Sequence, residues 1–309
     1  TLLGGFEFMT RVVSLLLLLS LVQCVIVIGL YWPKSIKIGQ PPDSVAQLIS
    51  PSIVGQVDEV VIGDEYDNEV RLVKRGERWL LPELGSLPAD SVRVESLLAT
   101  LAGEQTGWPV ASTVAARQRF QVANYHYQRQ LTLMAKGEEV VILYLGTSPG
   151  FRKVHARRDD QDAIFSIGLG VFDIPGVGGH WLDRRLLQIR TPTRIVADGY
   201  SLERRGDQWV SGIGKVPDSR ELEALLGALR SLQVEGVASA DMQRDLSGAE
   251  ARLVLKIQSL SGDTTLEFFS IAGESFIYSS EYALFFRLSD YDYDRFTGID
   301  ARLLEQSSG

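Results

Sequence analysis

Cysteine, histidine and positive charge are scarce in this sequence. The 309 residues include one cysteine and three histidines, and 39 acidic side chains outnumber 31 basic ones, giving a net charge of −8. The one cysteine, Cys24, lies inside an apolar run, so the rest of the chain has no disulfide framework and no cysteine-based metal site. Nucleic-acid binding needs clustered Lys and Arg. The acidic balance therefore argues against a nucleic-acid partner.

Motifs for catalysis are also missing. His126, His155 and His180 are scattered without a metal spacing such as H-E-x-x-H, and no G-x-S-x-G nucleophile turn occurs. His126 and His155 fall in stretches that we predict to be strands, where a place on the surface or at a sheet edge is the ordinary interpretation. We therefore expect no catalytic residue, no cofactor and no metal ion.

Three polar stretches contain residue types that are found in ligand sites. The glycine-rich SIGLGVFDIPGVGGHW at 166–181 lacks G-K-[ST], so we interpret it as a flexible loop. The aspartates of DYDYD at 290–294 lack the glycine and the terminal glutamate of a calcium loop, which favours a solvated loop or a partner-facing rim. The basic FRKVHARRDD at 151–160 indicates a charged strand edge, with a docking patch as the alternative.

The longest uncharged run, 12–32, predicts a membrane helix. Its 21 residues would span about 31 Å as a helix, which matches a hydrocarbon core. A cleaved signal peptide would have a shorter apolar core, and a lipoprotein signal would need small residues before its cysteine, so a retained anchor is the interpretation we favour. Basic residues flank both ends, which leaves the orientation open.

One face of this run carries small or polar residues. Gln23 is the strongest polar group, and the face is completed by Ser20, Cys24 and Gly29. An interhelical hydrogen bond there would bind another membrane helix. The other interpretation is a single polar residue that a very apolar helix tolerates.

A repeated pattern dominates the remainder. RGERWLLPELGSLPADSVRVESLLATL begins at residue 75, and RGDQWVSGIGKVPDSRELEALLGAL begins at residue 205. Asp90 and Asp218 stand as helix N-caps. Strand-like segments follow in both copies, and each copy closes with D-x-R-L-L, at 183–187 and 300–304. The predicted anchors of the repeat are Trp79, Asp90, Leu97, Leu98 and Leu101 in the first copy, and Trp209, Asp218, Leu225, Leu226 and Leu229 in the second.

These patterns predict an α+β fold class: an N-terminal transmembrane helix followed by two tandem copies of an antiparallel-sheet-plus-helix unit. The expected segments are a flank at 1–11, the membrane helix at 12–32, a linker at 33–54, a first repeat at 55–190 and a second at 191–309.

Several motifs resemble one bacterial family. They are the hairpin V-x-L-x-(R/K)-x-G-x-x-W from Val70 to Trp79, the cap and helix LPADSVRVESLL at 87–98, the strand end LYLG at 143–146, and the D-x-R-L-L closures. Over roughly 55–305 the chain is similar to the family called domain of unknown function 4340. The resemblance implies a bacterial inner-membrane protein with a periplasmic domain, often encoded beside an ABC-type transporter whose auxiliary subunit is similar to gliding-motility components. It carries over no catalytic residue.

The leading functional hypothesis is a non-catalytic accessory subunit that 12–32 anchors in the lipid bilayer beside an integral ABC-type transporter partner. Its duplicated body would bind a protein or an envelope polymer, with Tyr291, Tyr293 and Arg295 as contact residues. The alternative is a periplasmic substrate-binding receptor that uses the cleft between the two repeats. A hydrolase ranks third.

Overall fold

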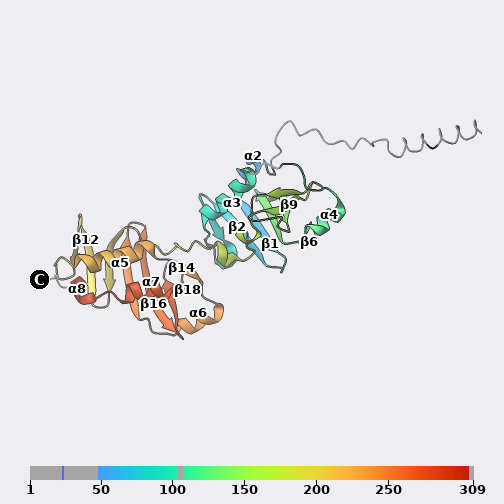
Figure 1. The fold of residues 1–309 in the computed structure, drawn as a ribbon. Coiled ribbons are helices and arrows are strands. Elements are labelled where there is room, and N and C mark those ends of the chain that lie inside the picture. The colour runs from blue at the N-terminus through green and yellow to red at the C-terminus, as the bar shows by residue number, and fades with distance from the viewer. Residues whose placement is uncertain (1–22, 24–47, 104–106, 306–309) are drawn as a thin grey trace, which may run out of the picture. The chain divides into compact units, whose positions relative to one another are not determined.

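The computed structural model describes residue 23 and residues 48–103 and 107–305 (Figure 1). The chain is a mixed α/β protein built on antiparallel sheets, and the described residues from Leu48 onward belong to one compact unit. None of the helices in the described part has the length and apolar character needed to cross a bilayer. The membrane helix predicted at 12–32, with Ser20, Cys24 and Gly29, lies outside the described residues. Gln23 alone of that stretch is described, and it is helical and exposed.

The first half contains an eight-stranded antiparallel sheet in the order β10-β9-β8-β7-β1-β2-β3-β4. Its strands are β1 (Glu59–Asp64), β2 (Glu69–Arg75), β3 (Arg78–Leu81), β4 (Leu87–Pro88), β7 (Arg129–Ala135), β8 (Glu138–Leu145), β9 (Val154–Arg158) and β10 (Phe165–Ile167). The hairpin of β5 (Val122–Ala123) and β6 (His126–Tyr127) is separate. The helices are α2 (Pro51–Val54), α3 (Ser91–Gly103) and α4 (Val114–Arg119), with the 3-10 turns η1 (Pro82–Leu84), η2 (Val171–Asp173) and η3 (Gly178–Trp181).

Alternating side chains explain why these segments pair as strands. In β1, Val60 and Ile62 are fully buried, while the alternate residues Glu59, Val61 and Gly63 are only partly covered. A strand points successive side chains to opposite faces, so this pattern directs one face toward a core. The helix α3 supplies the matching stripe of Val94, Leu97, Leu98 and Leu101, all of them buried.

The second half contains another eight-stranded antiparallel sheet, in the order β13-β12-β11-β15-β16-β17-β18-β14. Its strands are β11 (Pro192–Ala197), β12 (Tyr200–Arg205), β13 (Gln208–Ser211), β14 (Val234–Val237), β15 (Leu253–Ser259), β16 (Gly262–Ile271), β17 (Glu274–Ser279) and β18 (Leu284–Leu288). Its helices are α5 (Ser219–Ser231), α6 (Ala240–Ser247), α7 (Asp290–Thr297) and α8 (Ala301–Glu305).

Helices cover the two faces of the second sheet unequally. On β16, Phe268 meets Phe296 of α7 with ring centroids 4.7 Å apart. The next residue, Phe269, points to the opposite face and joins a smaller apolar cluster with Leu246 of α6. Lys256 and Gln258 of β15 are exposed. The part of the sheet around them is therefore open to solvent.

The two sheets have the same strand order over seven of their strands. From β3 the first runs β3-β2-β1-β7-β8-β9-β10, and from β13 the second runs β13-β12-β11-β15-β16-β17-β18. They differ at the edges, where β4 extends the first sheet beyond β3 and β14 extends the second beyond β18.

The prediction of a flexible loop at 166–181 is wrong. Trp181 is fully buried and its Nε1 donates to the carbonyl of Pro175 at 2.8 Å, while Arg129 Nε donates to the carbonyl of Ile174 at 2.8 Å. At Gly176 a Cβ would lie 3.1 Å from Asp64, so only glycine fits this approach without a shift. The glycines of this stretch serve close packing against the sheet.

Two other predictions are also wrong. The basic stretch at 151–160 is not a sheet edge, because β9 pairs with both β8 and β10. The stretch at 290–294 is not a loop, because it is the start of helix α7. Leu48 and Ile49, which lie in the stretch expected to be a linker, are buried in the core.

Candidate functional site

Two of the predicted contact residues, Tyr291 and Arg295, line a hollow beside α7. Its volume is about 520 Å³, and we call it the α7 groove. The groove is lined by Arg184, Ser231, Gln233, Val234, Glu235, Ser289, Tyr291, Asp292 and Arg295. Ser289 starts the helix, because its hydroxyl accepts a hydrogen bond from Asp292 N at 3.1 Å.

Arg295 and Tyr291 form an ordered pair at this groove. Successive turns of a helix bring residues four apart together, and the Arg295 guanidinium lies 5.4 Å from the centre of the Tyr291 ring. Arg295 Nη1 donates to Ser231 Oγ at 2.9 Å and to Asp292 Oδ1 at 3.2 Å. Tyr291 is 72% exposed, whereas Asp292 is buried. A buried carboxylate therefore holds the cation beneath an exposed ring.

Tyr293 does not share this surface. It stands two residues after Tyr291, so it lies on another side of α7 and packs against the main core. Burial raises the pKa of its phenol, although Arg252 opposes the shift. Of the three predicted contact residues, the structure brings together Tyr291 and Arg295.

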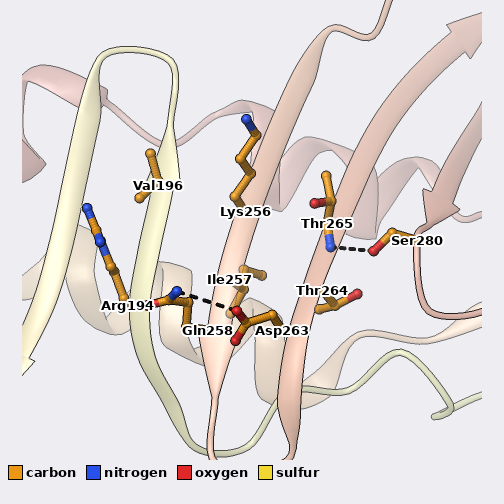
Figure 2. Close-up of a pocket in the computed structure, with 9 residues that line it drawn as sticks. All are labelled: Arg194, Val196, Lys256, Ile257, Gln258, Asp263, Thr264, Thr265 and Ser280. Carbon is orange, nitrogen blue, oxygen red and sulfur yellow. Dashed lines mark hydrogen bonds between the residues drawn. The ribbon is translucent and has the colours of Figure 1, made fainter.

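A second hollow lies on the open face of the second sheet (Figure 2). This sheet-face hollow has a volume of about 360 Å³. It is lined by Arg194, Val196, Lys256, Ile257, Gln258, Asp263, Thr264, Thr265 and Ser280. Gln258 Nε2 donates to Asp263 Oδ2 at 3.4 Å, and Thr265 N donates to Ser280 Oγ at 2.8 Å. The hollow offers polar and charged groups at the solvent surface.

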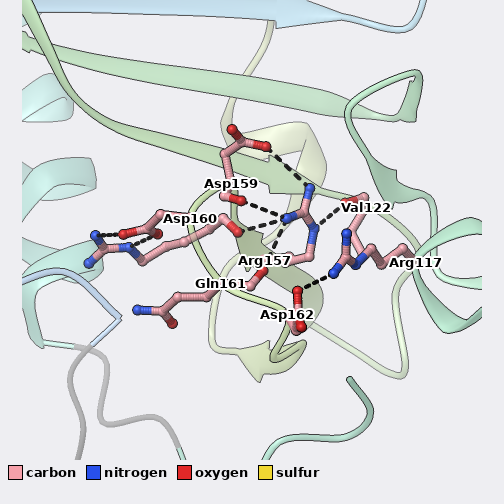
Figure 3. A network of polar contacts seen from close by, with 8 residues as sticks. Arg117, Val122, Arg157, Asp159, Asp160, Gln161 and Asp162 are labelled. Carbon is pink, nitrogen blue, oxygen red and sulfur yellow. Dashed lines mark hydrogen bonds and ion pairs between the residues drawn. The ribbon is translucent and has the colours of Figure 1, made fainter. Parts of the chain in front are cut away.

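A network of polar contacts surrounds Arg157, a residue that the sequence analysis placed on a charged strand edge (Figure 3). Its side chain is buried, and its Nε donates to Val122 O at 2.8 Å. Its Nη1 reaches the carbonyls of Arg158, Asp159 and Gln161 at 2.9, 3.2 and 3.1 Å. Burial, together with nearby Arg117, lowers the pKa of this guanidinium below its ordinary value. Such a cation fixes the segment after β9 in place.

The histidines occupy three different settings. His155 is buried, and its ring stacks on Phe120 with centroids 4.2 Å apart, so its predicted surface place is wrong. His126 and His180 are exposed, in β6 and η3. Within the ranges that the structure describes, no group of three or more His, Cys, Asp or Glu side chains is arranged to hold a metal ion.

The predicted repeat anchors hold similar but unequal positions. Trp79 is 1% exposed and Trp209 is half-buried. Asp90 accepts from Arg93 N at 3.2 Å, and Asp218 accepts from Arg220 N at 3.0 Å and from Glu221 N at 3.1 Å. The leucines at 97, 98, 101, 225 and 229 are buried, and Leu226 is partly buried.

Comparison with known proteins identifies one family. A family model described as Domain of unknown function (DUF4340) matches residues 79–250, more than half of the 309 residues. No curated protein and no solved structure matches the chain significantly. The matched region begins at the buried Trp79 and includes both helix caps, Asp90 and Asp218. The chain belongs to the family Domain of unknown function (DUF4340).

Proposed function

We propose that this protein is a non-catalytic accessory subunit, anchored in the bacterial inner membrane by 12–32, whose periplasmic body binds a partner protein through the α7 groove. The observation that carries the proposal is the ordered Tyr291–Arg295 pair.

Tyrosine and arginine dominate the binding energy of many protein interfaces. A side chain that is already held in place loses less conformational entropy when a partner binds. Arg295 is held by Ser231 and Asp292, and Tyr291 presents its ring above it. The pair is thus prepared for contact, and the hollow beside it gives room for a side chain of the partner.

The partner that the family resemblance favours is an integral subunit of an ABC-type transporter. A membrane helix at 12–32 would place the body beside such a subunit, and the face around Gln23 would supply a second contact inside the bilayer. The sheet-face hollow is a further surface for an envelope polymer or protein.

We also propose that the body arose as two copies of one α+β unit. The shared strand order supports this, as do the equivalent tryptophan and aspartate anchors. Because the first-half strand β4 and the second-half strand β14 have no counterparts, the edges would have diverged most.

The alternative function, a substrate-binding receptor, has weaker support. The segment 186–189, which connects the halves, and strands β15 and β16 line a hollow of about 210 Å³. Small-molecule sites usually measure about 300–1,000 Å³. This hollow is therefore small for a metabolite, and a thermal-shift screen against envelope metabolites would have to raise the melting temperature to favour the receptor.

Co-purification of the full chain tests the accessory role. We expect the tagged chain, extracted in mild detergent, to recover transporter subunits, and Tyr291→Ala to reduce recovery about 30-fold, the effect of losing a residue of hot-spot strength. Tyr291→Ala removes only an exposed ring, so the fold should persist. The matched control is Leu260→Ala, at a residue of the same half that is 80% exposed.

Two results would overturn the proposal. One is isolation of the wild-type chain as a clean monomer without any transporter subunit. The other is equal recovery with the wild-type chain and with Tyr291→Ala.

A further inference from the structure

Three segments of the first half converge around Phe120. They are the end of α4, the β5–β6 hairpin and the turn between β8 and β9. Thr147 N in that turn donates to the carbonyl of Phe120 at 2.9 Å, and the Phe120 ring stacks on His155 of β9. Figure 1 shows α4 and β6 at the same end of the first half.

The tips of these segments carry exposed aromatic side chains. Phe151, in the β8–β9 turn, is 92% exposed, and Tyr125, between β5 and β6, is 69% exposed. The turn that presents Phe151 is ordered, because Ser148 Oγ hydrogen-bonds the carbonyls of Gly150 and Lys153 at 2.7 Å each. Val114 at the start of α4 is also exposed.

The same end is basic in a protein that is acidic as a whole. The segments 107–128 and 146–158 contain no Asp or Glu, although the whole chain has a net charge of −8. Three of their arginines, Arg117, Arg157 and Arg158, pair with Asp162, Asp159 and Asp160. Arg119, Arg152 and Lys153 have no acidic partner within 4 Å among the residues that the structure describes. We call Arg119, Tyr125, Phe151, Arg152 and Lys153 the aromatic–basic tip.

We propose that the aromatic–basic tip lies on the anionic headgroups of the bilayer that holds 12–32, an inference that rests on the proposed anchor. Tyrosine favours the membrane–water interface, and phenylalanine is typical of the surfaces that insert into it. Lysine and arginine near an anionic leaflet are attracted to its surface. The two kinds of side chain at one end of the fold therefore match an anionic phospholipid surface.

The segment between the predicted anchor and the first half is short enough to keep the aromatic–basic tip close to the bilayer. Fifteen residues, 33–47, separate the end of the apolar run from Leu48. At about 3.5 Å per residue they extend at most about 50 Å. The first half is thus confined near the bilayer, where a modest attraction suffices to hold the tip against it.

Site-directed labelling of the full chain in vesicles tests this contact. A Cys24→Ser background removes the one native cysteine, and Phe151→Cys or the control Leu260→Cys then carries an environment-sensitive fluorophore. In vesicles of phosphatidylcholine with phosphatidylglycerol, we expect lipid-borne quenchers to quench the label at 151 and to leave the label at 260 bright.

Charge reversal then measures how much the two cations contribute to membrane binding. Replacing both Arg152→Glu and Lys153→Glu should lower the ratio of docked to free tip by at least about 30-fold in the anionic vesicles, because each cation contributes to lipid attraction. Vesicles of phosphatidylcholine alone should weaken the quenching in the same direction. Circular dichroism checks that these exposed substitutions leave the fold intact.

The failures are distinguishable. If the chain does not float with the vesicles, the anchor is wrong, and the proposal for the tip falls with it. If the chain floats but the labels at 151 and 260 are quenched equally, only the tip proposal is overturned. Equal quenching at 151 with and without phosphatidylglycerol contradicts the role of charge.

Discussion

At the scale of single residues, Arg157 shows how the setting of a charge decides its role. In sequence it is one of four basic residues between 152 and 158. In the fold it is covered, and one guanidinium binds four carbonyls. Buried polar groups that lose their partners cost free energy. The residue is therefore part of the internal structure, whereas Arg152 and Lys153 remain outside.

Removing this guanidinium should destabilise the protein strongly. We expect Arg157→Met to lower the free energy of unfolding by about 3 kcal/mol, because the carbonyls it binds lose their donor. Denaturant unfolding followed by tryptophan fluorescence measures the change. Arg158→Met, which breaks the ion pair with the exposed Asp160, should cost less than about 1 kcal/mol. Equal costs for the two variants would contradict this role.

Single residues were predictable from sequence where hydrophobicity alone decides their place. Trp79 and the leucines of α3 are buried, as expected for large apolar groups on a helix stripe or strand. His155 was not placed correctly, and Tyr293 packs against the core, because amphipathic side chains pack wherever neighbouring elements cover them. The covering segments, α4 and the β5–β6 hairpin, lie far along the chain from β9 and leave no mark on its local pattern.

At the scale of elements, helix caps and the alternation of apolar side chains predicted most of the helices and strands. The strands from β1 to β3, and β12 in the second half, follow period-two patterns. Helices α3 and α5 begin next to aspartates. The sequence pattern did not predict helix α7, because its residues are mostly polar. Its position depends on the Ser289 cap and on Phe296, which packs against β16.

The caps provide a test at this scale. Asp218→Ala and Asp90→Ala should each lower the free energy of unfolding by about 1 kcal/mol, because backbone N–H groups at the helix start lose an acceptor. The cost at Asp218 should be the larger, since it accepts from two backbone groups and Asp90 accepts from one. Asp207→Ala, at a fully exposed side chain, is the control. A cost at Asp218 no greater than that of the control would refute the capping role.

At the scale of the whole molecule, the two sheets share one strand order over seven strands, β3-β2-β1-β7-β8-β9-β10 and β13-β12-β11-β15-β16-β17-β18. This shared order agrees with the similar stretches after Arg75 and Arg205, and the duplication itself stays a prediction. The edge strands β4 and β14 were not predictable. Each is a strand in one half only, so no comparison of the halves could locate them. Helix α6 follows β14 at the place where α4 follows the bridge of Ala111 in the first half. Two of the three predicted contact residues, Tyr291 and Arg295, line the α7 groove, and Tyr293 does not.

The central claim is that the α7 groove touches a membrane partner in the cell. Photocrosslinking in intact cells tests it most directly, with a photoreactive amino acid placed at Tyr291 or, as control, at Leu260. The account predicts that position 291 forms a covalent adduct with one integral membrane protein and that position 260 does not. The absence of any adduct at 291, or the same adducts from both positions, would contradict it.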